Sequence, residues 1–281
     1  MSTHIDGTEE QALLVSAART LLFVPGDRPD RFDKAARSGA DLVVVDLEDA
    51  VAPEDKEEAR QAAADWPGLG GRTVVRVNAP GTPWCEADLA MAADRGCPVM
   101  VPKAEDPAVL GGIAARTAGR CALIPLVETA LGVERAHDVC SVPGVVRIAF
   151  GNVDLAARLG VAHDDTLALA HARSRLVLAS AAAGIGRPVD GVTTAVRDLE
   201  ALRTATAHAR RLGYAGKLCI HPSQIGPVAD GFAPSDGEIR WARAVLGAGA
   251  SVTTVDGQMV DRPVLERARD ILAVADRRSR G

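Results

Sequence analysis

Several features that mark other classes of protein are scarce in this chain of 281 residues. Aromatic side chains make up only 3%, too few for a surface on which nucleic-acid bases stack. The net charge is −5, so no basic surplus points to nucleic acid. No apolar run approaches the length of a membrane span, and the first residues lack the basic segment and long apolar core of a signal peptide. We therefore expect a soluble cytoplasmic protein.

Cysteines are also few, and their arrangement argues against two kinds of structural site. The five are Cys85, Cys97, Cys121, Cys140 and Cys219. None forms a C-x-x-C pair and the count is odd. This favours buried cytosolic thiols over a zinc site or a disulfide framework.

What the sequence does contain is a regular alternation of apolar runs and amphipathic segments. Eight short runs have apolar interiors with little alternation, as expected for parallel strands covered on both faces. They are residues 20–26, 41–49, 73–78, 98–105, 121–128, 146–152, 187–192 and 217–222. The segments between them carry helix-start and helix-end signals, such as Pro29 and Gly39. Eight such units predict an α/β fold of the closed TIM (β/α)₈ barrel type.

The first and last of the eight strand–helix units set the expected boundaries of the barrel. A doubly wound open sheet is the main alternative fold, but no G-x-G-x-x-G follows the first strand. We expect residues 1–19 to form a flexible tail and residues 20–232 to form the barrel. In residues 233–281 the strand–helix rhythm breaks, which suits a C-terminal helical lid or an arm for oligomerisation.

Charged side chains gather at the ends of the expected strands, where barrel enzymes place their active sites. These strand ends carry Asp46, Glu48, Asp49, Arg76, Asn78, Lys103, Glu105, Glu128, Asp154, Asp190 and His221. So many carboxylates would repel one another unless a cation compensated for them. Oxygen ligands without a cluster of Cys or His favour Mg²⁺ over Zn²⁺. Glu128 and Asp154 come from adjacent strands and fit that need.

Each of these residues also has a simpler structural explanation. A carboxylate at a helix start commonly caps the helix or pairs with its dipole, and this role is favoured for Glu128 or Asp154 taken alone. The pair together, with Arg76 on a third strand, makes the functional interpretation equally good. An ion pair with Glu48 or Glu105 explains Lys103, and packing or capping explains His221 at least as well as catalysis does.

Seven stretches of the chain, spread over about residues 20–275, match one known family in order. They are LLFVPGDRPDRFDKAARSGADLVVVDLEDAVAPEDKEEAR, VVRVNAPGTPW, VPKAED, PLVETALGV, AFGNVDLAARLG, GYAGKLCIHPSQI and VDGQMVDRPVLERAR. In these stretches the chain resembles the citrate lyase β-subunit-like proteins of the HpcH/HpaI aldolase–citrate lyase superfamily. The resemblance implies a TIM barrel, a bound Mg²⁺ and a coenzyme A (CoA) thioester substrate.

The resemblance also implies a reaction and the residues that perform it. The reaction is carbon–carbon cleavage or formation between acetyl-CoA, or a homologue, and a 2-keto acid, with a β-hydroxyacyl-CoA such as malyl-CoA or citramalyl-CoA. The family's metal carboxylates correspond to Glu128 and Asp154, and its substrate-binding arginine corresponds to Arg76. Asp261 in MVDRP corresponds to the general acid/base of the stand-alone lyases. In those relatives the tail closes over a neighbouring subunit's site, which implies a trimer or larger homo-oligomer.

Further residues are candidates for holding the substrate. The family's acids after the second strand correspond to Glu48 and Asp49, which would hold water at the metal or orient Arg76. Backbone amides near Gly151 and Asn152 would assist in stabilising the oxyanion.

The CoA phosphates need cationic partners, and the segment after the first strand offers three. Arg28, Arg31 and Lys34 suit phosphates as well as they suit an exposed helix face. The long C-terminal tail and the DRPDRF motif favour CoA over a CoA-independent pyruvate aldolase.

Three other functions stay open beside the stand-alone lyase. A true citrate lyase β subunit, which cleaves a citryl group on an acyl carrier protein, carries a similar MVDRP tail. The second is the CoA-independent pyruvate aldolase, and the third is an inactive CoA-ester-binding protein, against which the intact Glu128, Asp154, Arg76 and Asp261 count. Small residues at 192–195, where many relatives carry aromatic or acidic ones, leave the choice of substrate open.

Overall fold

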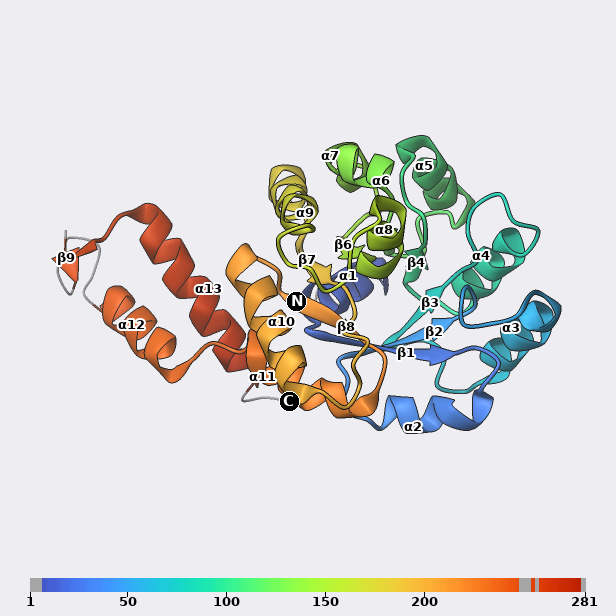
Figure 1. Ribbon diagram of the computed structural model, residues 1–281, viewed down its shortest axis with the longest axis horizontal. Coiled ribbons are helices and arrows are strands. Elements are labelled where there is room, and N and C mark those ends of the chain that lie inside the picture. Colours follow the sequence, from blue (N-terminus) through green and yellow to red (C-terminus); the bar gives the residue numbers. More distant parts are fainter. Residues whose placement is uncertain (1–6, 248–253, 256–257, 279–281) are drawn as a thin grey trace, which may run out of the picture. The chain divides into compact units, whose positions relative to one another are not determined.

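The computed structural model describes residues 7–247, 254–255 and 258–278. Eight parallel strands pair in sequence order, and the eighth pairs with the first to close a barrel (Figure 1). They are β1 Thr20–Pro25, β2 Leu42–Asp46, β3 Thr73–Arg76, β4 Val99–Val101, β5 Leu123–Val127, β6 Arg147–Phe150, β7 Gly186–Asp190 and β8 Gly216–Cys219. The expected (β/α)₈ barrel is confirmed, and the open doubly wound sheet is excluded.

Helices connect successive strands and surround the barrel (Figure 1). They are η1 Pro29–Arg31, α2 Phe32–Ala36, η2 Pro53–Asp55, α3 Lys56–Asp65, α4 Cys85–Asp94, α5 Pro107–Arg116, α6 Ala130–Glu134, α7 Ala136–Cys140, α8 Asn152–Leu159, α9 Ala170–Ala183, α10 Leu199–Leu212, η3 Pro222–Gln224 and α11 Ile225–Phe232. Several of these helices begin and end with residue types that are typical of helix caps. Asp106 accepts a hydrogen bond from the Ala108 amide and caps α5, and Gly213 ends α10 in the left-handed conformation.

The barrel interior is a packed apolar core. All five residues of β2 and of β5 are buried, which explains why these runs lack polar alternation. Side chains from all eight strands form one buried cluster that includes Leu21, Leu42, Val44, Val74, Met100, Ile124, Leu126, Ala149, Val189 and Leu218. A filled barrel holds its strand ends rigidly, so side chains at those ends have defined positions.

Residues 7–17 differ from the expectation of a flexible tail over residues 1–19, of which residues 1–6 lie outside the described residues. Gly7–Ala17 forms helix α1. The Gln11 side chain bonds to backbone groups just before β4 and β5, and Val15 is fully buried in the barrel cluster. The helix therefore packs against the amino ends of the strands, opposite the edge where active sites form. Its polar composition hid this role, since the segment has no regular apolar face.

The C-terminal part forms a second compact unit, with the division falling between Gly231 and Phe232. It contains α12 Asp236–Gly247, the short strands β9 Thr254–Val255 and β10 Gln258–Met259, and α13 Arg262–Arg278. Ala242, Val245 and Ala268 form its small core, and the Arg267 guanidinium lies 5.1 Å from the centre of the Trp241 ring.

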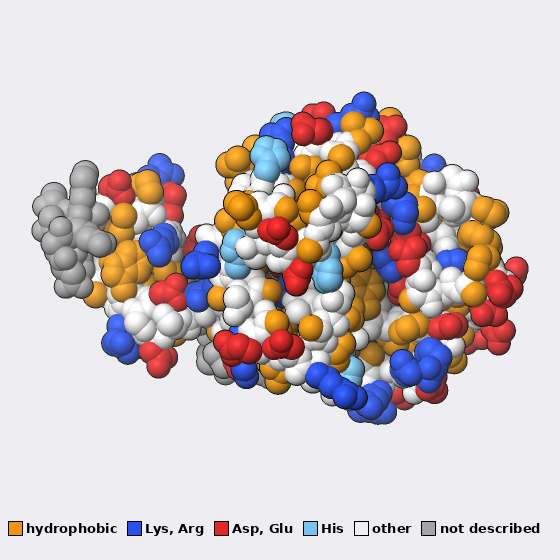
Figure 2. All heavy atoms as spheres, viewed as in Figure 1, with side chains coloured by type: hydrophobic (Ala, Val, Ile, Leu, Met, Phe, Trp, Pro, Cys, Tyr) orange, Lys and Arg blue, Asp and Glu red, His pale blue; other side chains and the backbone are white. Residues whose placement is uncertain are grey.

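The surface is of mixed character. Figure 2 shows acidic, basic and hydrophobic side chains interspersed on the face that it presents. Within the residues that the structure describes, no helix is both long enough and apolar enough to cross a membrane.

Candidate functional site

A cavity of about 300 Å³ opens among residues at the carboxyl ends of the barrel strands. One part of its wall is apolar and comes from Phe23, Leu126, Phe150, Val192, Leu218 and Ile220. The polar part is formed by Asp46, Asp49, Arg76, Glu128, Asn152 and Asp154. An apolar hollow with a few convergent polar groups is typical of sites for small molecules. The cavity therefore brings together Asp49, Arg76, Glu128 and Asp154, four of the charged residues expected at the site.

Arg76 is held in the cavity wall by two carboxylates. Asp46 and Arg76 are register partners on β2 and β3, and the guanidinium forks onto both carboxylate oxygens of Asp46 at 2.7 and 2.6 Å. A third nitrogen, Nη1, lies 3.1 Å from Glu48 Oε2. Burial acts to lower the pKa of Arg76, but Asp46 and Glu48 outweigh it and raise that pKa. The structure thus presents a permanent positive charge in a fixed orientation.

Glu48 is a buried carboxylate within this ion-pair network. Its side chain is 7% exposed, and burial raises its pKa despite the opposing effects of Arg76 and Lys103. Asp46, which orients Arg76 directly, was expected at the strand ends, but no role was assigned to it there. The signal was present in the sequence, because DLVVVD and TVVR end together if the two strands pair in parallel.

Glu128 follows β5 and is buried, with 4% of its side chain exposed. It does not cap the helix that follows it, since Thr129 accepts the capping hydrogen bond from the Gly132 amide. Glu128 Oε1 instead accepts a hydrogen bond of 2.8 Å from the Lys103 amide. Burial is the main cause that raises the pKa of Glu128 to about 7. The structural explanation offered by helix capping is therefore wrong for this residue.

Asp154 lies in the first turn of α8, and its side chain is 39% exposed. Gly151 occupies the cap position just before that helix. A side chain at Gly151 would overlap Glu128, because an added Cβ would lie 2.4 Å from the Glu128 Cβ and 2.7 Å from Oε2. Glycine here allows α8, and with it Asp154, to come close to Glu128.

Two of the expected substrate contacts have roles within the protein. The Gly151 amide donates to the Val127 carbonyl at 2.9 Å, so it is already engaged in the strand ladder. The buried Asn152 side chain donates to the carbonyls of His163 and Val192 at 3.1 and 3.2 Å. Asn152 thus connects the start of α8 to the segments that contain His163 and Val192.

Lys103, for which ion pairing was the expected role, belongs to the same cluster of charged residues. Its ammonium bonds to Glu48 Oε1 at 2.6 Å. The same nitrogen lies 3.8 Å from Glu128 Oε1 and 3.9 Å from Asp154 Oδ2. The partner is therefore Glu48, one of the two carboxylates that ion pairing suggested. These distances also show that the carboxylates of Glu128 and Asp154 approach a common point.

The donor set fits Mg²⁺ better than other metals. No three His, Cys, Asp or Glu side chains converge as a metal cage in the described part of the chain. Mg²⁺ characteristically takes one or two protein carboxylates and keeps its other positions for water and substrate oxygens. Glu128 and Asp154, buried and half-exposed respectively, offer that number of ligands beside an open cavity. A structural Zn²⁺ site, which needs four ligands rich in Cys and His, does not fit.

Other strand-end residues lie outside this cluster. Asp190 is buried in an ion network with Lys217 and Arg173, at 2.8 and 3.0 Å. Burial alone would raise the pKa of Asp190, but these two cations lower it. The His221 ring accepts from the Ser223 amide and caps η3, as the structural explanation proposed.

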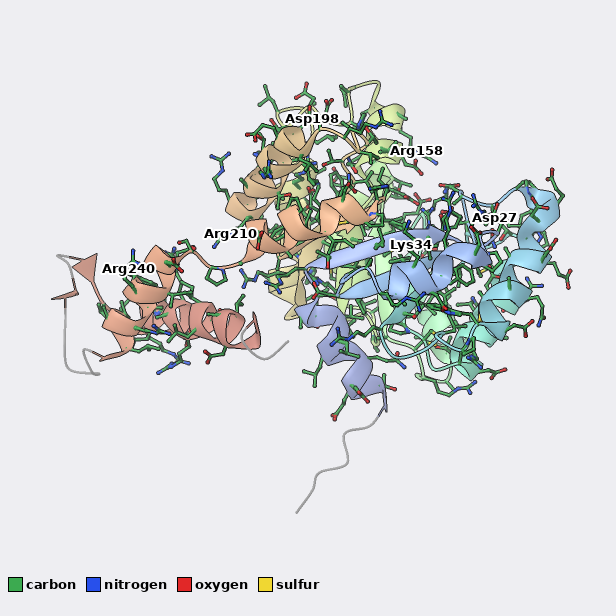
Figure 3. All side chains as sticks on the ribbon, turned by 90° about the horizontal axis from the view of Figure 1, so that it is seen from below. Asp27, Lys34, Arg158, Asp198, Arg210 and Arg240 are labelled. Carbon is green, nitrogen blue, oxygen red and sulfur yellow. The ribbon has the colours of Figure 1, made fainter. Side chains whose placement is uncertain are left out.

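The remaining candidates lie on the surface of their units. Arg28, three residues after cavity-lining Pro25, forks onto Asp30 at 2.9 Å. Arg31 is exposed, as is Lys34 on α2 (Figure 3). In the C-terminal unit, Asp261 is exposed, and its carboxylate accepts from the Val264 amide at 3.2 Å at the start of α13.

Comparison with known proteins agrees with this geometry. The family model described as HpcH/HpaI aldolase/citrate lyase matches residues 19–222. A citrate lyase subunit beta-like protein of Mycobacterium tuberculosis is 40% identical over 263 residues, covering 89% of this chain and 93% of that protein. A (3S)-malyl-CoA thioesterase of Cereibacter sphaeroides is 34% identical over 271 residues, covering 92% and 94%.

A solved structure is also similar over nearly its whole length. The crystal structure of CitE from Mycobacterium tuberculosis, in complex with magnesium, acetoacetate and coenzyme A, superposes with a TM-score of 0.82. The two chains are 38% identical, and the match covers 93% of this chain and 99% of that one. Sequence motifs, barrel topology and overall similarity agree, and the chain therefore belongs to the HpcH/HpaI aldolase/citrate lyase family.

Proposed function

We propose that this protein is a Mg²⁺-dependent carbon–carbon lyase that acts on a β-hydroxyacyl-CoA such as malyl-CoA or citramalyl-CoA. The products are acetyl-CoA, or a homologue, and a 2-keto acid, and the reverse condensation uses the same groups. One observation carries the proposal: Glu128, Asp154 and Arg76 line a single cavity at the strand ends. The related CitE crystal structure, which contains magnesium and coenzyme A, supports it.

Glu128 and Asp154 would hold the metal ion. When bound, Mg²⁺ supplies a Lewis acid for the carboxylate and 2-oxygen of the keto acid. Arg76 would stabilise the oxyanion of the thioester enolate, because its charge is permanent and Asp46 holds its orientation before substrate arrives. Glu48 and Asp49 would hold water near the metal and support Arg76. The apolar wall limits the water that can reach these groups.

The proton transfer is assigned to Asp261. In condensation its carboxylate would take a methyl proton from the thioester, and in cleavage it would return that proton to the enolate. The family resemblance implies a C-terminal segment that closes over a neighbouring subunit's site, and we therefore propose that the protein works as a trimer or a multiple of it. Light scattering that gave the mass of a monomer at assay concentration would contradict this assembly.

The CoA phosphates are assigned to Arg28, Arg31 and Lys34. The Arg28–Asp30 pair is exposed, and such pairs contribute little to stability, so a phosphate can replace the aspartate. A comparison of CoA esters with a carrier-linked substrate distinguishes CoA from an acyl carrier protein as the carrier of the acyl group.

A second candidate is a thioesterase, which the 34% identity to a (3S)-malyl-CoA thioesterase favours. Hydrolysis of the thioester would release free CoA and a hydroxy acid, whereas the lyase releases acetyl-CoA and a keto acid. The two reactions therefore differ in which bond breaks and in which thiol compound appears.

A panel of malyl-CoA, citramalyl-CoA and citryl-CoA, together with a citryl acyl carrier protein, tests the proposal. Each is incubated with Mg²⁺ and, in parallel, with excess chelator. The lyase produces acetyl-CoA and keto acid in equal amounts, only where Mg²⁺ is present. Free CoA without acetyl-CoA would instead identify a thioesterase, and cleavage of the carrier-linked substrate alone would identify a citrate lyase subunit. Turnover that chelator does not affect would overturn the metal assignment.

A further inference from the structure

Lys103 has a backbone conformation that is unusual for lysine. Its φ is +52°, in the left-handed region that glycine adopts freely and other residues rarely do. It lies two residues after the end of β4, beside the cavity's carboxylates. A strained residue of this kind persists where its surroundings fix it, and such residues cluster at functional sites.

The amide of Lys103 faces Glu128. That amide donates to Oε1 at 2.8 Å, and Gly151 lies close to the other oxygen, as the 2.7 Å distance from an added Cβ to Oε2 shows. Within the described residues, no donor forms a hydrogen bond to Oε2. One carboxylate oxygen is therefore fixed by the protein, while the second is left for another ligand.

The Lys103 side chain reaches into the same cluster. Its ammonium bonds to Glu48 at 2.6 Å and lies within 3.8–3.9 Å of Asp49, Glu128 and Asp154. Four carboxylates thus share one ammonium, and Glu48 also pairs with Arg76. A divalent cation bound by Glu128 and Asp154 would lie close to this positive charge and would be repelled by it.

We propose that Lys103 is a positioning residue of the metal centre and also its internal counter-ion. Its amide sets the orientation of Glu128, and its ammonium neutralises the carboxylates, so that an incoming divalent cation competes with it. The proposal rests on the proposed function, because it takes Glu128 and Asp154 as the metal carboxylates. Like charges a few ångströms apart repel even in water, so removing the ammonium should strengthen metal binding by about tenfold.

Mn²⁺ binding in the absence of substrate tests this, with free Mn²⁺ followed by electron paramagnetic resonance. Lys103→Met removes the charge and should bind Mn²⁺ about tenfold more tightly than the wild type. Lys103→Arg keeps the charge and should stay within about threefold of the wild type. Unchanged or weaker binding by a folded Lys103→Met variant would overturn the counter-ion role. A wild type that binds no Mn²⁺ would overturn the proposed metal site itself, which is a different outcome.

A second pair of variants tests the left-handed backbone conformation of Lys103. Lys103→Gly and Lys103→Ala both lose the ammonium and keep the amide, but only glycine adopts the left-handed conformation without strain. We expect the glycine variant to melt at a higher temperature than the alanine variant and to bind Mn²⁺ as tightly as Lys103→Met. Equal melting temperatures for the two variants would overturn the role of the conformation.

Discussion

Replacing Gly151 with alanine is a direct test of how the site brings its two carboxylates together. The added Cβ would lie 2.4 Å from the Glu128 Cβ and 2.7 Å from Oε2. Carbon atoms in contact are separated by about 3.5–4.0 Å, so Glu128 or helix α8 must move by about 1 Å. The backbone of Gly151 has φ −91° and ψ 79°, so positive-φ strain would not be the cause of the effect.

The Gly151→Ala substitution should have two separate effects, one on stability and one on metal affinity. Forcing one extra methyl group into a packed site costs about 1–3 kcal/mol of stability. Metal–ligand distances tolerate changes of only about 0.2 Å, so a shift of about 1 Å removes Glu128 from its ligand position. Disturbing a residue that orients a metal ligand typically lowers affinity by about 10–100-fold, and we expect a loss in that range.

Titration with Mn²⁺ and a thermal melt measure the two effects in the same preparation. Gly111→Ala is the matched control, since Gly111 lies in helix α5 and no atom comes within 4 Å of an added Cβ. It should keep its Mn²⁺ affinity and gain about 1 kcal/mol of stability from better helix propensity. Mn²⁺ affinity of Gly151→Ala within twofold of the wild type would refute the close approach of Glu128 and α8.

Three further variants separate orientation, stability and proton transfer. Asp46→Asn weakens the fork that orients Arg76, so kcat should fall by about a hundredfold in steady-state assays while Mn²⁺ affinity is unchanged. Lys217→Met leaves Asp190 buried with one cation fewer, and chemical denaturation should show a loss of about 3–5 kcal/mol in the free energy of unfolding. Asp261→Asn should abolish proton transfer without altering Mn²⁺ affinity or fold, and full lyase activity in this variant would contradict its assigned role.

The barrel and the position of its site could be predicted because both follow from repetition. Eight buried apolar runs with helices between them allow few other arrangements, and parallel strands place all their carboxyl ends on one edge. Glu128 and Asp154 were therefore expected at that edge before any contact was known.

The pairing of individual side chains depends on details that a single strand does not show. Asp46 and Arg76 meet because β2 and β3 pair in one register, and a shift of that register would separate them. Asp190 stands at a strand end like the others, yet Lys217 from β8 draws it into a buried network. The left-handed conformation of Lys103 has no signature in its residue type, so its amide contact with Glu128 could not be foreseen.

Glu128 and Asp154 are proposed to bind the metal ion on which carbon–carbon cleavage depends. Calorimetric titration of Mg²⁺ into the wild type and into Glu128→Ala tests this most directly. We expect one Mg²⁺ per chain for the wild type and a loss of affinity of at least about a hundredfold for the variant. Normal Mg²⁺ binding by a folded Glu128→Ala variant would contradict it.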